Sequence, residues 1–512
     1  MKSRTILHLV IFLFALSPLR SAYSEPPVFP VPDHPLLEQF NASDSSPWLS
    51  GTTLTNPAHE ALSLIESSAL HGLEPEDYHY SVLHHLVDSG VSAQTDYFND
   101  LLSDALLDLI HDFAVGRLDP AMVDPDWHIE RDSVNPADIL HKALIDGQLR
   151  NTVNQLLPDL RQYHQLTEAL SRYRSFVARG GWHALSMSGL LKPGQSHPMI
   201  PALRERLTFE QVGNTDSDHV SSQFYDNDLV QRVKRFQQLR GLNQDGIIGP
   251  QTLSALNLSA EQMVDKIRIN LERFRWLPNK LAKRYLLINL GSYQLIAMDN
   301  QDIALSMKVI VGKKTRSTPT FSSAMTHIVI NPYWNVPLKL AKEDLLPKQQ
   351  ANPDYLYLHN FAIYQRGDDS GTEVDPYRVD WRSISPADFP FRLQQRPGRD
   401  NALGTLKFMF PNSWDIYLHD TPEKALFDKA QRNFSSGCIR VEQPMALAEF
   451  SLNGDVDHDS LAEKIASGQN QGVQLKQPLA VYAVYFTVWP QEGDVYFSDD
   501  PYKRDAKFLK YL

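Results

Sequence analysis

The sequence contains very little cysteine: a single residue, Cys438, among 512. A lone cysteine cannot form a disulfide within the chain, which excludes a disulfide-stapled fold. The residue is therefore either a small buried apolar side chain or a free thiol kept for chemistry. Composition alone does not decide between the two, so the neighbouring residues must.

Several chemical patterns are also absent. The formal net charge is −12 and no basic stripe is present, so no nucleic-acid partner is expected. His-Glu-x-x-His is missing and no tight His/Asp cluster occurs, so neither a metal nor another cofactor is expected. No serine lies three residues before a lysine, and Gly-x-Ser-x-Gly is missing, which disfavours the common serine acyl enzymes.

Long apolar runs are scarce, and the clearest one lies at the start of the chain. Lys2 and Arg4 precede the apolar run Ile6–Leu16, and small residues at Ala22 and Ser24 follow it. This order is typical of a cleavable secretory signal. We expect residues 1–24 to be a signal peptide, with an uncleaved anchor as the alternative.

What remains is typical of globular domains, with 42% hydrophobic and 21% charged residues. The length predicts two to four domains. Apolar spacing is helical at first, as in residues 100–113, and changes to a strand rhythm after residue 284. The sequence predicts a multidomain α+β protein with these parts: a helical scaffold domain at 25–181, a small helical module at 182–258, a linker helix at 259–283, a β-rich domain at 284–494 and a C-terminal tail at 495–512.

The β-rich domain is interrupted. Its expected strands lie at Tyr285–Leu290, Tyr293–Met298, Leu305–Val311, His327–Ile330 and Asp415–Leu418. Between about 338 and 398 the strand rhythm is lost, although aromatic residues persist. An insert of this length in a compact domain is typically functional or disordered. The aromatic content favours an ordered lid.

The pair that could carry chemistry lies after this insert. His419 directly follows an expected strand, and Cys438 comes 19 residues later in Ser435-Ser436-Gly437-Cys438-Ile439-Arg440. A thiol is a strong nucleophile only as thiolate, and a neighbouring imidazole can take its proton. Gly437 lets the backbone pass close to a substrate. Spacing alone leaves a structural role for both residues open.

Two stretches resemble known families. Residues 233–256, with Phe236, Gln237, Asp245-Gly246 and Gly249, are similar to the peptidoglycan-binding domain family. The stretch from His419 to Arg440 resembles the signature of L,D-transpeptidases of the YkuD type, as do Asn331–Pro337 and Gly398–Phe408. Many members carry a second histidine where Ser436 stands. The domain order is similar to that of large periplasmic L,D-transpeptidases, which implies a periplasmic location.

The resemblance implies roles for the individual residues. Cys438 would attack the carbonyl of the third stem residue in a peptidoglycan tetrapeptide, and His419 would move the proton. The N–H groups of Gly437 and Cys438, with the Tyr417 hydroxyl, would form an oxyanion hole, and Ser436 would stand in the site wall. Arg440 would hold a substrate carboxylate or form a structural ion pair. Either the carbonyl or the carboxylate of a residue near His419, such as Asp420, would orient the imidazole.

The expected reaction joins a tetrapeptide donor to an acceptor stem in a 3→3 cross-link, with release of D-alanine. The thioester could instead be taken by water, which would make a carboxypeptidase or an endopeptidase. A third possibility is attachment of a protein to the wall. A peptidoglycan-binding scaffold without activity is the non-enzymatic alternative. The membrane would matter for export only.

Overall fold

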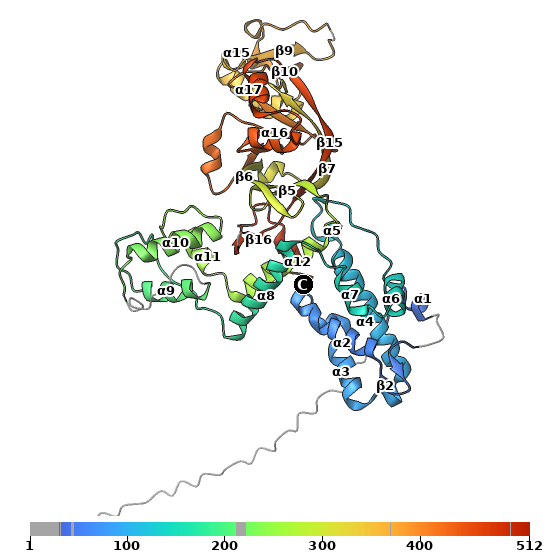
Figure 1. Ribbon diagram of the computed structural model, residues 1–512. Helices are drawn as coiled ribbons and strands as arrows, with labels where there is room; N and C mark the ends of the chain where they lie inside the picture. The colour runs from blue at the N-terminus through green and yellow to red at the C-terminus, as the bar shows by residue number, and fades with distance from the viewer. Residues whose placement is uncertain are drawn as a thin grey trace, which may run out of the picture.

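The computed structural model describes residues 30, 32–41, 46–210, 222–368, 370–491 and 493–511. The expected signal peptide lies outside these residues. No helix in the described part is long and apolar enough to cross a membrane. Figure 1 shows a helical scaffold at the lower right, a small helical module at the left, and a β-rich domain above both. The expected α+β architecture is confirmed.

The scaffold forms around one long buried helix. α4 (Thr95–Val115) carries buried leucines on several sides because other helices surround it. Gly116 ends it with a positive φ, and a Cβ there would meet Trp276. The surrounding helices are α1 (Leu37–Asn41), α2 (Asn56–Ser67), α3 (Tyr80–Ser89), α6 (Pro136–Ile145) and α7 (Leu149–Asn154); β1 (Leu49–Ser50), β2 (Thr53–Leu54) and α5 (Pro120–Val123) complete the domain.

The small module has its own apolar core and consists of α9 (Ile200–Phe209), α10 (Asn227–Leu239) and α11 (Pro250–Leu256). Gln237, from the peptidoglycan-binding pattern, is buried and bonds to Asp245 and Thr252. The pattern residue Gln237 therefore fixes the turn after α10 rather than facing solvent.

Two helices join the parts. α8 (Arg161–Ala178) packs on α12 (Ala260–Arg275), which Ser259 begins with a capping box. α12 carries buried residues around most of its circumference because it lies between α8, α4 and the large sheet. It is thus a common support of the scaffold and the β-rich domain.

The large sheet has ten strands, and since β11 pairs with both β12 and β7, it closes on itself. Period-2 alternation divides its side chains: Leu286 and Ile288 face one apolar core, while Tyr285 and Leu287 face the core against α12. Its strands are β3 (Trp127–His128), β4 (Arg284–Asn289), β5 (Gln294–Asp299), β6 (Asp302–Gly312), β7 (Thr320–Ile330), β11 (Leu406–Met409), β12 (Leu418–His419), β13 (Asn433–Ser435), β14 (Ile439–Val441) and β15 (Gln471–Val484). α16 (Pro444–Leu452) and α17 (His458–Ala466) contribute to its core.

The strand expected at Asp415–Leu418 was wrong in its bounds. Asp415 has a φ of +53°, and the Asn412 side chain holds the loop by bonding to both backbone groups of Ile416. Residues 415–417 therefore form an irregular loop after the turn at 413–414, and the strand begins at Leu418. That turn directs the chain into the site described below.

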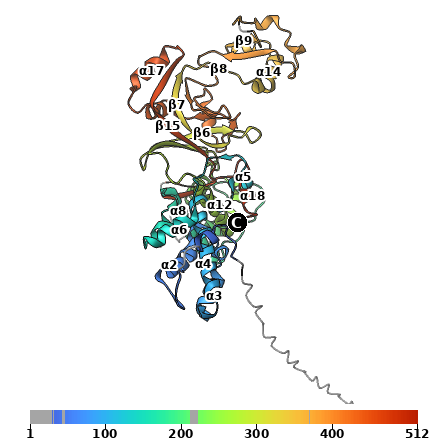
Figure 2. The ribbon, with the colours of Figure 1, turned by 90° about the vertical axis from the view of Figure 1, so that its right-hand side faces the viewer.

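The insert is an ordered subdomain. A three-stranded sheet of β8 (Trp334–Asn335), β10 (Phe391–Gln395) and β9 (Phe361–Gln365) surrounds an apolar cluster of its own. α13 (Leu338–Leu340), α14 (Leu346–Ala351) and α15 (Tyr355–Leu358) complete it. Figure 2 shows β8, β9 and α14 projecting beyond the main sheet. Strand rhythm is thus present inside the segment where the sequence suggested none.

The end of the chain packs firmly against the protein. β16 (Val488–Gln491) and β17 (Asp494–Phe497) form a hairpin, and α18 (Asp505–Phe508) follows. Asp505 forms a buried ion pair with Arg273 of α12 at 2.6 Å. The hairpin touches α10 as well. Residues 495–512, expected as a tail, therefore support both the helical module and the sheet over their described part.

Candidate active site

Two short parallel strands bring the sequence-predicted residues together. In the pairing of β12 with β14, Leu418 is opposite Ile439 and His419 is opposite Arg440. Leu418 and Ile439 are fully buried in the sheet core. Because side chains alternate along a strand, the neighbouring positions, including Cys438, face the other way. All five candidate side chains, those of Tyr417, His419, Ser436, Cys438 and Arg440, line one cavity of about 1300 Å³.

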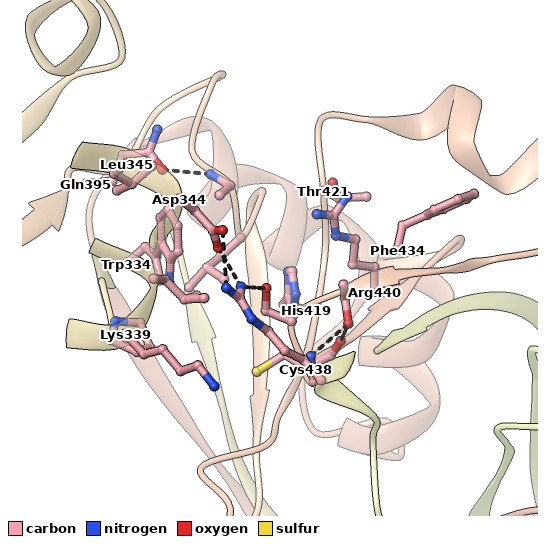
Figure 3. Close-up of a pocket in the computed structure, with 18 of the residues that line it drawn as sticks. Trp334, Lys339, Asp344, Leu345, Gln395, His419, Thr421, Phe434, Cys438 and Arg440 are labelled. Carbon is pink, nitrogen blue, oxygen red and sulfur yellow. Dashed lines mark hydrogen bonds and ion pairs between the residues drawn. The ribbon is translucent and has the colours of Figure 1, made fainter. Parts of the chain in front are cut away.

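The insert forms the opposite wall of this cavity. Lining residues from it include Lys339, Asp344 and Leu345. Figure 3 shows the Cys438 sulfur pointing towards the side on which Trp334 and Lys339 lie, and away from Phe434. The site is therefore a cleft between the closed sheet and the inserted subdomain.

The His419 ring is fixed as a base. Its Nδ1 lies 2.5 Å from the backbone carbonyl oxygen of Asp420, which can only accept a hydrogen bond. Nδ1 therefore carries the proton, and Nε2 has a free lone pair. Burial, helped by the Arg440 guanidinium, lowers the pKa of His419 to about 3. The imidazole is neutral at every physiological pH.

The Asp420 carboxylate has a different task. It accepts from the Thr405 and Thr421 N–H groups at 2.9 and 2.7 Å, and from the Lys424 ammonium at 2.6 Å. Gly404 makes room for it, since a Cβ there would lie 2.3 Å from the carboxylate. Of the two orienting groups considered for His419, the structure has the carbonyl, and the carboxylate fixes the loop that carries it.

The Cys438 thiol is not paired with His419 in the described structure. Its Sγ donates weakly to the Asp415 carbonyl oxygen at 3.8 Å. Burial raises the pKa of the Cys438 thiol, although hydrogen bonding by Tyr417 and the charge of Lys407 oppose this. The protonated thiol is therefore favoured in this state, because desolvation outweighs the groups that favour the thiolate. The resting pair is a thiol and a neutral imidazole.

Tyr417 and Lys407 form the electrostatic surroundings of the thiol. The Lys407 Nζ lies 3.8 Å from the centre of the Tyr417 ring. Burial lowers the pKa of Lys407, while burial and the adjacent Cys438 hold the pKa of the Tyr417 hydroxyl well above its usual value. The Trp334 side chain also bonds to this hydroxyl. Tyr417 is thus a neutral donor beside the sulfur.

Sequence reasoning assigned no role to Lys407. The sequence does contain a signal, the alternation of apolar Leu406 and Phe408 with a lysine between them. In the structure both apolar residues are fully buried, so Lys407 faces the side that His419 occupies. Its position opposite His419 in β11 comes from sheet pairing, which spacing along the chain does not reveal.

The residues before the cysteine form a tight turn. Ser435 Oγ donates to the Cys438 carbonyl at 2.5 Å and accepts from the Gly437 N–H at 3.2 Å. The Gly437 carbonyl accepts from Thr318 at 2.7 Å. Both backbone groups of Gly437 are therefore engaged, contrary to the expectation that its N–H would serve an oxyanion. No hydrogen bond of the Cys438 N–H is found within the described part of the chain.

Ser436 and Arg440 lie at the rim with charged neighbours. Ser436 accepts from Arg316 at 2.9 Å, and Arg316 also pairs with Glu343 and Asp344 of the insert at 2.5 and 2.6 Å. Arg440 forms an ion pair with Glu423, which is well exposed. Of the two expectations for Arg440, the ion pair is the one present in the free protein.

Comparison with known proteins agrees with this geometry. Residues 283–459 match the L,D-transpeptidase catalytic domain family (YkuD). The chain carries an L,D-transpeptidase catalytic domain. Ahead of this transpeptidase domain, residues 39–170 match a family described as "Scaffold domain", and residues 197–256 match one described as "Putative peptidoglycan binding domain".

Individual relatives are similar to parts of the chain. A Haemophilus influenzae protein named "Putative L,D-transpeptidase" is 34% identical over 303 residues, which are 58% of this chain and 60% of that protein. The chain thus spans about 60% of the length of this curated relative. A solved L,D-transpeptidase from Mycobacterium smegmatis covers 40% of this chain and 60% of its own, at 12% identity and a TM-score of 0.19. One from Xylanimonas cellulosilytica covers 58% of this chain and 98% of its own, at 13% identity and a TM-score of 0.19.

Proposed function

We propose that this protein forms 3→3 cross-links in peptidoglycan, with Cys438 as the nucleophile and His419 as the base. The observation that supports this most strongly is the bond from His419 Nδ1 to the Asp420 carbonyl. It leaves Nε2 as a free base in the cavity that holds the chain's one thiol. A neutral base and a protonated thiol in one cavity are the correct starting pair for proton transfer at attack.

In the first half-reaction the thiol turns from the Asp415 carbonyl towards His419. Sγ forms a bond to the carbonyl carbon of the third stem residue, and its proton moves to Nε2. The bond from that carbon to the nitrogen of D-alanine then breaks, and the imidazolium gives its proton to the departing amine. The product is a thioester on Cys438 and free D-alanine.

The oxyanion of the tetrahedral intermediate needs two donors. The Cys438 N–H and the Tyr417 hydroxyl are our candidates, since the Gly437 N–H is engaged by Ser435. The high pKa of Tyr417 keeps its hydroxyl protonated and able to donate. Gly437 and Ser436 then serve to shape the wall around the nucleophile.

In the second half-reaction the side-chain amine of an acceptor stem attacks the thioester. His419 takes one proton from that amine and returns it to Sγ as the C–S bond breaks. Because the new amide replaces the one cleaved, no external energy source is needed. Water would give hydrolysis at the same step, so the insert, acting as a lid, has to exclude it.

Arg440 carries two proposed tasks. Its positive charge contributes to the lowered pKa of His419 and so keeps the base neutral. A substrate carboxylate can also replace the exposed Glu423 as its partner. The second task would select a stem that carries a carboxylate near the reacting carbonyl.

The rest of the chain fits a cell-wall enzyme. We propose that residues 1–24 direct export and that the protein works in the periplasm, where its polymer lies. The domain at 25–181 would act as a scaffold, and the module at 182–258 would hold the chain on peptidoglycan. Neither proposal requires a metal or a cofactor.

The decisive experiment uses purified disaccharide-tetrapeptide and mass spectrometry of the products. The wild-type protein should give a dimer with loss of D-alanine, and the matched variants Cys438→Ala and His419→Gln should give none. A tripeptide alone would make the protein a carboxypeptidase. A dimer formed by Cys438→Ala would contradict the assignment of the nucleophile.

A further inference from the structure

A second cleft, of about 660 Å³, lies between the peptidoglycan-binding module and the closed sheet. One wall comes from the residues that follow α10, including Asn243 and Gln244, and the other from β5, β6 and the segment 427–432. In Figure 1 the module lies beside β16, below β5 and β6. None of the residues assigned to the transpeptidation reaction lines this cleft.

The two walls are held in a fixed relation by the β16–β17 hairpin. Arg235 of α10 forms an ion pair with Asp494 of β17. The Arg240 guanidinium lies 4.7 Å from the centre of the Phe497 ring. These two contacts to β17, one from α10 and one from the residue that caps it, make a defined groove rather than a chance gap between loosely linked domains.

The chemistry of the lining is that of a neutral, hydroxyl-rich ligand. A primary amide presents both donors and an acceptor, as ring hydroxyls and acetamido groups require. Gln294 already donates to Ser306 and to Gln491 at 3.0 and 2.8 Å, which fixes part of this surface. The amide side chains in the lining are those of Gln238, Asn243, Gln244, Gln294, Gln431 and Gln491.

The charged groups of the lining balance in sign: three basic residues, Lys308, Lys429 and Arg432, stand with three acidic ones, Asp428, Glu442 and Asp499. Arg432 donates to the carbonyls of Val309, Lys429 and Tyr293. Lys308 pairs with Glu442 at 3.5 Å. A polyanion would find little unopposed positive charge here, which favours an uncharged polymer over a phosphate-containing one.

The distance along β6 between the second cleft and the catalytic cavity is comparable with the length of a stem peptide. On β6, Ser306 and Lys308 line the second cleft, whereas Lys313, just past its end, lines the catalytic cavity. Five residues of strand span roughly 16 Å. A lactyl group and three stem residues reach roughly 14 Å when extended. The segment 422–436 separates the two cavities and lines both.

From these observations we infer that this second cleft binds the glycan strand of peptidoglycan, a chain of N-acetylated amino sugars, and thereby presents an attached stem to Cys438. The inference rests on the proposed function for its catalytic consequence, but glycan binding itself does not depend on it. The module and the transpeptidase domain would then bind one polymer together. The sugars would lie in the second cleft and the stem peptide in the catalytic cavity.

The test compares two donors and two matched double variants. Asn243→Ala with Gln431→Ala removes exposed amides from opposite walls of the cleft, and Gln251→Ala with Gln301→Ala removes exposed amides from the same two domains outside it. For glycan oligomers that carry tetrapeptides, the cleft variant should show a rise in KM of about tenfold, as expected for one or two lost hydrogen bonds. For the free tetrapeptide it should match wild type, and the control variant should match wild type on both.

The outcomes separate the inference from the proposed function. Equal KM values for both donors in wild type, or an undiminished glycan preference in the cleft variant, would overturn the inference and leave the function standing. Binding is measured independently by titrating peptide-free glycan into Cys438→Ala protein with and without the cleft changes. Binding that the cleft changes abolish supports the site even if no donor reacts, and no binding to Cys438→Ala overturns it.

Discussion

At the residue scale, the reactivity of Cys438 depends on a balance between burial and nearby charge. Burial keeps the thiol protonated, and the Lys407 ammonium opposes this by favouring the thiolate. The same ammonium disfavours a protonated His419. Lys407 therefore shifts the pKa values of both partners in the proposed proton transfer. It acts through its charge and takes no part in the bond changes itself.

The first prediction concerns Lys407→Met, with Lys407→Arg as the matched control. Without the cation the pKa of Cys438 rises further and that of His419 rises as well. Alkylation of Cys438 by iodoacetamide should therefore slow severalfold at pH 8, with the rate profile displaced to higher pH. Lys407→Arg should retain the wild-type profile. An unchanged profile in Lys407→Met would mean that the ammonium does not act on the sulfur.

The carbonyl that orients His419 gives the second prediction. Asp420→Asn leaves that carbonyl in place and keeps one side-chain oxygen to accept from the loop, so kcat should fall by no more than a few fold. Gly404→Ala places a Cβ against the Asp420 carboxylate, at a φ of +61°, and should displace the loop that holds the imidazole. We expect kcat to fall by about a hundredfold or more, since a misplaced base loses most of its effect.

The thermal midpoint distinguishes displacement from unfolding in this pair. Gly404→Ala should keep most of its folded fraction at the assay temperature while losing turnover. Equal losses of turnover in Gly404→Ala and Asp420→Asn would instead assign the orienting task to the carboxylate.

At the scale of elements, the insert is tied to the nucleophile turn through one side chain. Arg316 bonds to Glu343 and Asp344 on the lid side and to Ser436 on the other. Hydrogen bonding to Asp344 is the largest contribution to the raised pKa of Arg316, and the pKa of Asp344 is lowered in turn. The position of the insert against the turn that carries Cys438 therefore depends on the ion pairs and the hydrogen bond of Arg316.

The third prediction follows from these contacts of Arg316. Arg316→Ala should loosen the lid and admit water, so the ratio of tripeptide product to cross-linked dimer should rise severalfold at similar donor consumption. Arg378→Ala, which removes an exposed arginine from the same insert, is the control and should leave the ratio unchanged. The two products are measured by mass spectrometry. An unchanged ratio in Arg316→Ala would contradict a water-excluding lid.

The sequence predicts these elements unevenly, for physical reasons. Long periodic segments such as α4 and α12 can be placed from spacing alone, because their apolar faces repeat over several turns. β7 begins at Thr320, earlier than expected, because Ser322 and Ser323 weaken its apolar pattern. β3 has two residues and forms by pairing with β7, while Trp127 packs against Trp276; both contacts are far from it in sequence.

The candidate site divides in the same way. The sequence indicates the Cys438 and His419 pair because both residues lie in a short, recognisable stretch. Their surroundings depend on contacts between distant segments: β11 brings in Lys407, and the Asp415 carbonyl accepts the weak hydrogen bond of the thiol. The protonated resting state of the thiol could not be predicted from spacing, since it results from burial.

At the scale of the whole molecule, α12 and the C-terminal segment hold the domains together. The Arg273 guanidinium of α12 is fully buried and pairs with Asp505 of α18 at 2.6 Å. Asn270 of α12 exchanges hydrogen bonds with Thr487 at 3.0 and 2.8 Å. Thr487 in turn donates to Asp505 at 2.7 Å. The groups of this network are mostly buried. Removing one charge would therefore leave the opposite charge buried without its partner.

The fourth prediction tests this network through Arg273→Met, which keeps much of the side-chain volume. Breaking one partner of a buried ion pair costs about 3–5 kcal/mol, whereas an exposed pair contributes about 0–1 kcal/mol. In urea unfolding followed by tryptophan fluorescence, Arg273→Met should lower the midpoint of the transition that exposes the core around α12. Arg378→Ala, at an exposed pair, should not lower it.

The hairpin that lines the proposed glycan cleft lies between Thr487 and Asp505 in the chain. Arg273→Met should therefore weaken glycan binding more strongly than it affects the reaction of free tetrapeptide. Suppose that Arg273→Met loses glycan binding and tetrapeptide reaction together while the unfolding midpoint stays unchanged. The network around Arg273 and Asp505 would then act directly on the catalytic cavity rather than through the joined domains.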